Sequence, residues 1–99
     1  MPASSEPLGV GEVADRLVIL AKHLHARPAG RIAQAAARHQ ASAIELVVGQ
    51  RRVNARSVLA VMGLGAVSGS AVRITVAGPD ADAVADEVVR ILESPDPDE

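Results

Sequence analysis

The sequence predicts an α+β fold, in which a four-stranded antiparallel sheet carries three helices on one face. Three observations predict it. The expected elements follow in the order βαββαβα. The clearest strands alternate apolar and polar side chains, so each has one face for a core and one for water. The chain has 99 residues, of which 48% are hydrophobic, and this suits one compact core. We therefore expect one domain with the architecture of an open-faced sandwich.

The first half of the chain contains the expected strand, helix and hairpin. Residues 17–20 form a short apolar run, which predicts a strand. Residues 29–39 carry apolar side chains at helical spacing, although most of them are small. Residues 44–48 alternate in the manner of a strand, and Gly49-Gln50 is a tight turn. Residues 51–54 then complete a hairpin.

The second half adds a short helix, a strand and a final helix. Ser57 suits the N-cap of a helix over residues 58–62, which ends at Gly63. Residues 72–76 alternate as a half-buried strand. Asp80 and the acidic residue that follows favour the start of a helix, whose inner stripe would consist of Val84, Val88 and Ile91.

The two ends of the chain differ in composition from the part between them. Residues 1–12 are rich in Pro, Ser, Gly and Ala, and residues 94–99 are acidic and interrupted by proline. We expect a disordered leader and a disordered acidic tail on either side of a domain at 13–93. The leader has neither the basic start nor the apolar run of a secretory signal. No apolar stretch approaches the length of a membrane span, so we expect a cytoplasmic protein without membrane contact.

The composition disfavours several classes of function. The chain has no Phe, Tyr or Trp, and its net charge is -2. It therefore lacks aromatic platforms for bases and a general basic field, which argues against a nucleic-acid-binding domain. Without cysteine it has no disulfide, thiolate metal site or cysteine nucleophile. His23 and His25 form a His-x-His pair but no further ligands accompany them, so we expect no metal and no cofactor.

The segment around His25 has the strongest chemical pattern in the chain. It reads Lys-His-Leu-His-Ala-Arg-Pro-Ala-Gly over residues 22–30 and leads into the expected helix. A helix N-terminus presents backbone N–H groups and a positive dipole end, and such a site holds a phosphoryl group well. An imidazole there can act as a nucleophile. The guanidinium of Arg27 matches phosphate oxygens, and Pro28 suits a first helical turn.

Two segments carry a resemblance to a known family. His-Leu-His-Ala-Arg-Pro-Ala at 23–29 resembles the active-site signature of HPr, the histidine-containing phosphocarrier of the bacterial phosphoenolpyruvate-dependent sugar phosphotransferase system. Val-Asn-Ala-Arg-Ser-Val-Leu-Ala-Val-Met-Gly-Leu-Gly at 53–65 resembles the regulatory-serine segment of the same family. The resemblance covers residues 13–93 and agrees with the expected order of elements.

The resemblance implies a role for each site residue. His25 would accept phosphate on Nδ1 from enzyme I and donate it to enzyme II A domains, while Arg27 steadies the phosphoryl charge. Such a carrier is not an enzyme in the turnover sense, and we expect a monomer. Ser57 would match the serine that a dedicated kinase phosphorylates in some bacteria. The residues implied for partner docking are Ala26, Arg27, Gly30, Val58, Leu59 and Met62; of these, Leu59 and Met62 are the better candidates for exposure.

Other interpretations stay open beside this one. The chain could be an HPr-like regulatory binding module that acts through Ser57 or its docking face with little phosphotransfer; the presence of both His25 and Arg27 favours the carrier. Ser57 would cap its helix whether or not a kinase exists. The family usually has Gly at the position of His23 and often Asn at the position of Lys22. These differences from the usual family pattern are compatible with a main sugar carrier and with a specialised paralogue.

Overall fold

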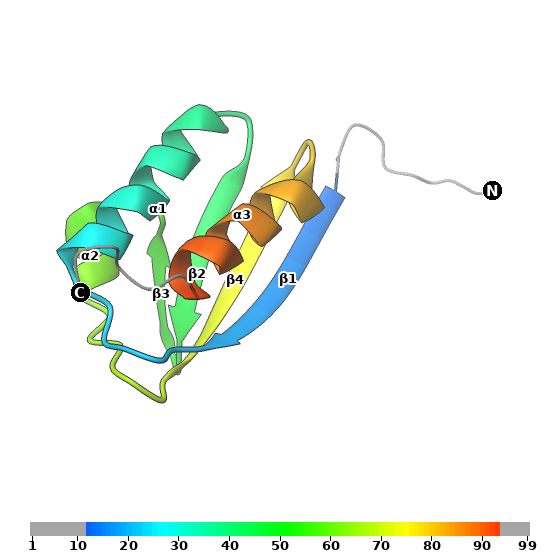
Figure 1. Cartoon of the computed structure of the whole chain (residues 1–99). Coiled ribbons are helices and arrows are strands. Elements are labelled where there is room, and N and C mark those ends of the chain that lie inside the picture. The colour runs from blue at the N-terminus through cyan, green and yellow to red at the C-terminus, as the bar shows by residue number, and fades with distance from the viewer. Residues whose placement is uncertain (1–11, 94–99) are drawn as a thin grey trace.

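The computed structural model describes residues 12–93 and contains the expected order of elements (Figure 1). These elements are β1 (Glu12–Ile19), α1 (Ala26–Arg38), β2 (Ala43–Val48), β3 (Arg51–Asn54), α2 (Val58–Met62), β4 (Ala71–Gly78) and α3 (Ala81–Glu93). Glu12, which the sequence analysis assigns to the leader, is the first residue of β1. The rest of the predicted leader, and the predicted acidic tail at 94–99, lie outside the described residues.

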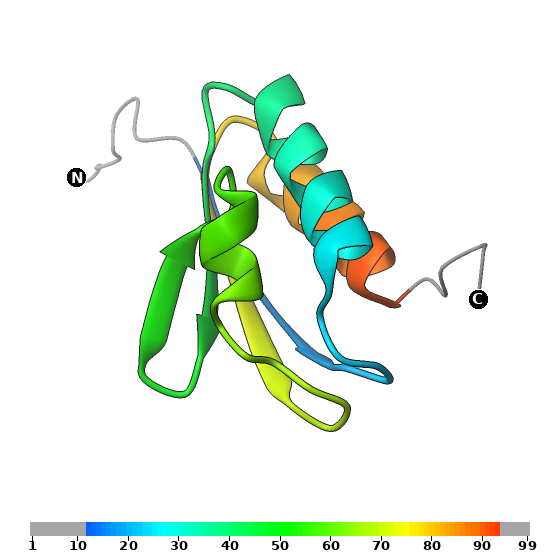
Figure 2. The ribbon, with the colours of Figure 1, turned by 90° about the vertical axis from the view of Figure 1, so that its left-hand side faces the viewer.

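The four strands form one antiparallel sheet in the order β1-β4-β2-β3. Leu46 in β2 lies opposite both Ile74 of β4 and Val53 of β3, so apolar side chains line up across the sheet. Figure 2 shows the helices on one side of the sheet and no helix on the other side of its described part. The predicted α+β open-faced sandwich is therefore confirmed.

The core lies between this sheet and the helices and is entirely aliphatic. Ile44, Leu46 and Ile74 point from the sheet into it and are almost completely buried. Ile32 of α1 and Val88 of α3 cover them from the helical side. The burial of each such side chain stabilises the fold by roughly 1.5–3 kcal/mol. Many aliphatic side chains therefore provide the stability that aromatic residues would supply in another core. Between Glu12 and Glu93 no helix is both long and apolar enough to span a membrane.

β1 differs most from its prediction, which placed a strand at 17–20. The strand begins at Glu12, and it is Ala14 and Val18 that point into the core. Val13, Leu17 and Ile19 lie on the other side and are 65%, 62% and 62% exposed. Because apolar residues occupy both faces, the alternation that marks a strand is hidden in the sequence.

Some other boundaries also move by a few residues. α1 starts at Ala26 rather than at residue 29, because His25 is already in the capping position. β4 extends to Gly78, whose φ is +136°. A Cβ at this position would lie 2.8 Å from the carbonyl oxygen of Ala41, so only glycine fits.

Candidate functional site

His25 is the N-cap residue of α1. Its backbone is extended, with φ −116° and ψ −169°, and its side chain makes no capping hydrogen bond. Its carbonyl accepts a hydrogen bond from the N–H of Ala29 at 3.1 Å, which is the first bond of the helix. The backbone therefore fixes His25 at the helix entry, while its imidazole is not used to cap the helix.

The first turn of α1 places the positive end of the helix dipole at the site. The N–H groups of Ala26 and Arg27 have no carbonyl four residues earlier within the helix, and Pro28 has no N–H at all. These N–H groups and the helix dipole favour an anion beside His25. Arg27 is exposed in the same turn, so its guanidinium can contact a group that approaches from solvent.

The loop that carries His25 is tied to the loop before β4. The N–H of Leu24 donates to Ala66 O at 2.9 Å. At the start of the loop, the N–H of Leu20 donates a hydrogen bond to Ser70 O at 3.0 Å. The carbonyl of Leu20 accepts a hydrogen bond from the N–H of Gly69 at 2.8 Å. The side chains of Leu20 and Leu24 are buried. The imidazole thus stands on a loop held at both of its ends.

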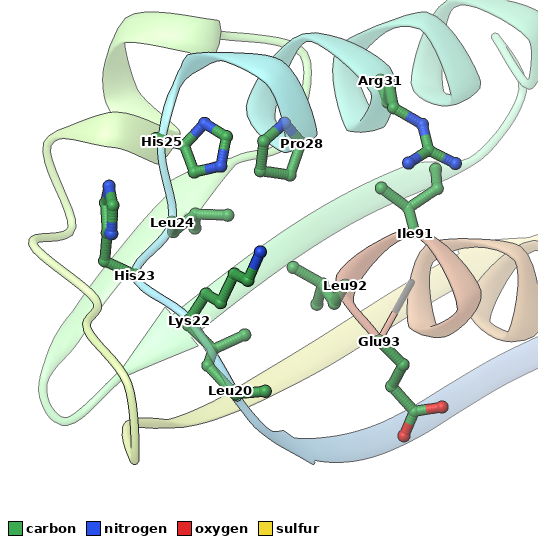
Figure 3. Close-up of a pocket in the computed structure, with 11 residues that line it drawn as sticks. Leu20, Lys22, His23, Leu24, His25, Pro28, Arg31, Ile91, Leu92 and Glu93 are labelled. Atoms are coloured by element: carbon green, nitrogen blue, oxygen red, sulfur yellow. The ribbon is translucent and has the colours of Figure 1, made fainter. Parts of the chain in front are cut away.

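A cavity of about 250 Å³ opens beside His25 (Figure 3). Lys22, His23 and Arg31 contribute its cationic or basic side chains. The rings of His23 and His25 are 5.1 Å apart between centroids and tilted by 50°. Within residues 12–93 no three His, Cys, Asp or Glu side chains are grouped as metal ligands. The remaining lining residues are Leu20, Ala21, Leu24, Pro28, Ile91, Leu92 and Glu93.

The second predicted segment forms a small face on α2. Ser57 is its N-cap, and its Oγ accepts a hydrogen bond from the N–H of Ala60 at 3.1 Å. Leu59 is 81% exposed and Met62 is 39% exposed, as expected for the two better candidates. Val58 is half-buried. Three of the predicted docking residues thus lie on α2, with different degrees of exposure.

The remaining predicted docking residues lie in the first turns of α1. Ala26 and Arg27 are exposed and Gly30 is half-buried. α2 packs against α1, and Figure 1 shows it beside the N-terminal part of that helix. The fold therefore brings the segment of His25 and the segment of Ser57 to the same side of the molecule. Ser57 does not line the cavity beside His25.

Arg56 has a structural role that the sequence analysis did not assign. Its guanidinium donates to three carbonyls at the end of α1, those of Ala36 at 3.0 Å, His39 at 3.0 Å and Ser42 at 3.1 Å. The carbonyls of Ala36 and His39 each also accept a backbone N–H, from His39 and Ser42 respectively, so Arg56 adds further hydrogen bonds to this turn. Arg56 thereby links the segment of Ser57 to the C-terminal end of α1. His39, the C-cap residue of α1, has its Nε2 2.9 Å from Oε1 of Glu87.

The cavity also contains residues that no local pattern indicates. Arg31 lies two residues beyond the signature at 23–29, and Ile91, Leu92 and Glu93 come from the last turn of α3. The three residues of α3 reach this cavity because α3 packs against α1. A basic residue at helical spacing from Arg27 was the one available signal for Arg31.

Comparisons with known proteins identify the family of this chain. The family model described as "PTS HPr component phosphorylation site" matches residues 15–94. The phosphocarrier protein HPr of Treponema pallidum (strain Nichols) is 42% identical over 71 residues, which cover 72% of this chain and 80% of that protein.

Solved structures agree as well. The phosphocarrier protein HPr from Bacillus anthracis str. Ames superposes with a TM-score of 0.74 at 28% identity, covering 82% of this chain and 98% of that one. HPr-C-His from Thermoanaerobacter tengcongensis gives a TM-score of 0.68 at 27% identity, with 82% and 90% covered. Because the family model spans most of the domain, including the capping histidine of α1, the chain belongs to the HPr family of phosphocarrier proteins.

Proposed function

We propose that this chain accepts a phosphoryl group on His25 from phospho-enzyme I and donates it to enzyme II A domains, in support of sugar uptake. The observation that carries the proposal is the position of His25 as N-cap of α1 without a capping bond from its side chain. The ring lies where backbone N–H groups favour an anion, and its side chain makes no capping hydrogen bond to the helix.

The proposed transfer needs little from the carrier itself. The lone pair of Nδ1 forms the new bond to phosphorus as the bond between phosphorus and its donor breaks, and Nε2 keeps its proton. Arg27 balances the negative charge of the phosphoryl oxygens, together with the N–H groups of the first turn. The protein is regenerated only by the next acceptor, so it acts as a stoichiometric carrier and not as an enzyme.

The proposed partners would dock over the start of α1 and over α2. Leu59 and Met62 offer exposed apolar surface there, and Arg27 offers charge. A small contact of this kind suits a carrier, since each partner has to be released after transfer. Ser57 stands at the rim of this surface, so a serine kinase that modifies it would change the docking. No nucleic acid is needed in this function.

The experiment is a labelling assay with phosphoenolpyruvate and a purified enzyme I. We expect an acid-labile, base-stable phosphate on the parent chain. The variant His25→Ala should lose all labelling, and His23→Ala is the matched control because its ring is the neighbour of His25. Both variants are checked for folding by circular dichroism. Labelling that persists in His25→Ala and disappears in His23→Ala would overturn the assignment.

A further inference from the structure

His23 lies beside the proposed acceptor ring, two residues before it in the chain. The centroids of the His23 and His25 rings are 5.1 Å apart, their planes are tilted by 50°, and both rings line the cavity beside α1. Figure 3 shows both rings on the loop that leads into this helix. His39, the third histidine of the chain, is the C-cap residue of α1 and lies at the other end of the helix. A second imidazole is therefore available next to the acceptor.

The anchoring of this loop sets the two rings in that position. Leu24, which lies between them, is buried, and its N–H donates to Ala66 O at 2.9 Å. Because Leu24 points into the core, the side chains on either side of it face away from the core, so that His23 is exposed and His25 is half-buried. Within residues 12–93 the His23 ring makes no hydrogen bond or ion pair, and its recorded contact is the ring of His25. The His23 ring can therefore take a further partner without breaking a bond of the fold.

The charged groups around His23 leave it without an anionic partner. The titratable or charged side chains that line the cavity with it are Lys22, His25, Arg31 and Glu93, whereas Arg27 and Arg90 in the neighbouring turns do not line it. Glu93, the one carboxylate among the lining residues, makes no ion pair with His23 in the described part of the chain. The loop of residues 63–70, which holds this site through Ala66, contains no titratable residue. A phosphoryl group on His25 would thus bring an anion to the His23 ring.

We propose that His23 is a second phosphoryl-binding side chain, whose cationic ring donates an N–H hydrogen bond to an oxygen of the phosphoryl group on His25. A phosphoryl group on a nitrogen of His25 projects beyond the edge of that ring. The His23 ring, exposed and with its centroid 5.1 Å away, can turn a nitrogen toward the phosphoryl oxygens. Charge-assisted hydrogen bonds of this kind are about 2.7–2.9 Å long and stronger than neutral ones. This inference rests on the proposed function and adds a residue to its site.

The contact would make the carried phosphoryl group sensitive to pH. As the bond from phosphorus to His25 forms, His23 takes up a proton from solvent, and it returns that proton when the group leaves for the next acceptor. An imidazole changes its charge between about pH 5 and 8, whereas the guanidinium of Arg27 stays cationic. The contribution of His23 should therefore be present at mildly acidic pH and absent at alkaline pH. A purely structural role of His23 would not depend on pH in this way.

The first test places the phosphate without enzyme I. The chain labelled with ¹⁵N-histidine is phosphorylated with phosphoramidate, and the product with a single phosphate is compared by NMR with the free chain between about pH 6 and 8. We expect the ring nitrogens of His23 to move toward the signals of the cation when His25 carries the phosphate, and those of His39 to stay in place. Unmoved His23 signals, or a phosphate on His23 in place of His25, would overturn the proposal.

The second test measures the equilibrium constant for phosphoryl transfer from enzyme I to the chain. His23→Gln keeps a donor without the charge, so it should lower this constant about threefold at about pH 6, as the loss of an exposed charge pair allows, and leave it unchanged at about pH 9. His23→Lys is cationic at both pH values, so it should match the parent at about pH 6 and exceed it at about pH 9. A constant for His23→Gln that equals the parent's at both pH values, or is lowered equally at both, would overturn the proposal.

His39→Gln is the matched control, since it removes an imidazole at the far end of α1. It should leave the transfer constant equal to the parent's at both pH values, and circular dichroism checks that every variant is folded. A pH-dependent loss in His39→Gln as large as that in His23→Gln would overturn the proposal. If enzyme I labels none of the chains, the proposed function fails, while the phosphoramidate spectra still decide whether His23 binds the phosphoryl group.

Discussion

At the scale of single residues, His25 and Arg27 divide the proposed task between them. The backbone of His25 starts α1, and Arg27 in the following turn supplies a charge exposed to solvent. These residues could be predicted from the sequence because a short signature fixes both their types and their spacing. Arg31 could not be predicted in the same way, because it lies outside this signature and the cavity that it lines is completed by residues of α3.

Removal of the Arg27 charge should slow phosphorylation without unfolding the domain. We expect Arg27→Ala to lower the labelling rate about tenfold or more, since a hydrogen bond to a charged group is worth about 1.5–3 kcal/mol. Arg27→Lys should recover part of the rate, because it restores the charge but not the guanidinium fork. The control is Arg73→Ala, an exposed arginine on β4. Equal labelling rates for Arg27→Ala and Arg73→Ala would contradict the role.

Gly30 offers a test of stability at one residue. It lies within α1, and a Cβ at this position would have no atom within 4 Å apart from its chain neighbours and the nearby backbone of its own helix. Alanine is more favourable than glycine in a helix by about 1 kcal/mol, so Gly30→Ala should raise the free energy of unfolding by that amount. Urea denaturation measures the change. A destabilised Gly30→Ala would show that the position needs glycine for a reason other than space.

At the scale of elements, the sequence predicts the helices and the central strands better than β1. β2 and β4 alternate cleanly because one face meets the core and the other meets water. β1 has apolar residues on both faces, so its apolar run at 17–20 marks only the end of the strand. The cavity was not predictable either, because Glu93 and His25 line the same cavity only once α3 has packed beside α1.

α2 links stability to the proposed regulation at Ser57. Because Oγ of Ser57 accepts the N–H of Ala60, Ser57→Ala should lower the free energy of unfolding by about 1 kcal/mol. Ser57→Asp retains an acceptor at a helix N-terminus, so this variant should stay folded. The resemblance implies an acidic docking surface on enzyme I, which the added carboxylate would repel. Phosphorylation of Ser57→Asp should therefore need a higher concentration of enzyme I than phosphorylation of the parent. Equal concentration dependence for Ser57→Asp and the parent would defeat the regulatory role.

At the scale of the whole molecule, Glu87 couples stability to pH by joining α3 to the end of α1. A hydrogen bond from His39, helped by Arg38, holds the pKa of Glu87 below its ordinary value of 4.5, against burial, which raises it. The folded-state pKa is therefore lower than the unfolded one. The stability from this carboxylate is present above about pH 4.5 and is lost as the pH falls through the folded-state value.

The variant Glu87→Gln tests this coupling. The parent should unfold at higher urea than the variant at about pH 5.5, and its advantage should shrink toward about pH 3 as Glu87 is protonated. The control is Asp80→Asn, which removes a carboxylate elsewhere on the molecule. Asparagine is chosen because Asp80 has a φ of 59°, a backbone conformation that asparagine tolerates. A difference in stability between the parent and Glu87→Gln that does not change with pH would contradict the coupling of Glu87 to pH.

The phosphocarrier function itself is tested most directly by locating the phosphate. The chain is phosphorylated with phosphoenolpyruvate and enzyme I after labelling with ¹⁵N-histidine, and the nitrogen bonded to phosphorus is identified by NMR and mass spectrometry. We predict a single phosphate on Nδ1 of His25. A phosphate on His23, on His39 or on the hydroxyl of Ser57, with His25 unmodified, would contradict the account.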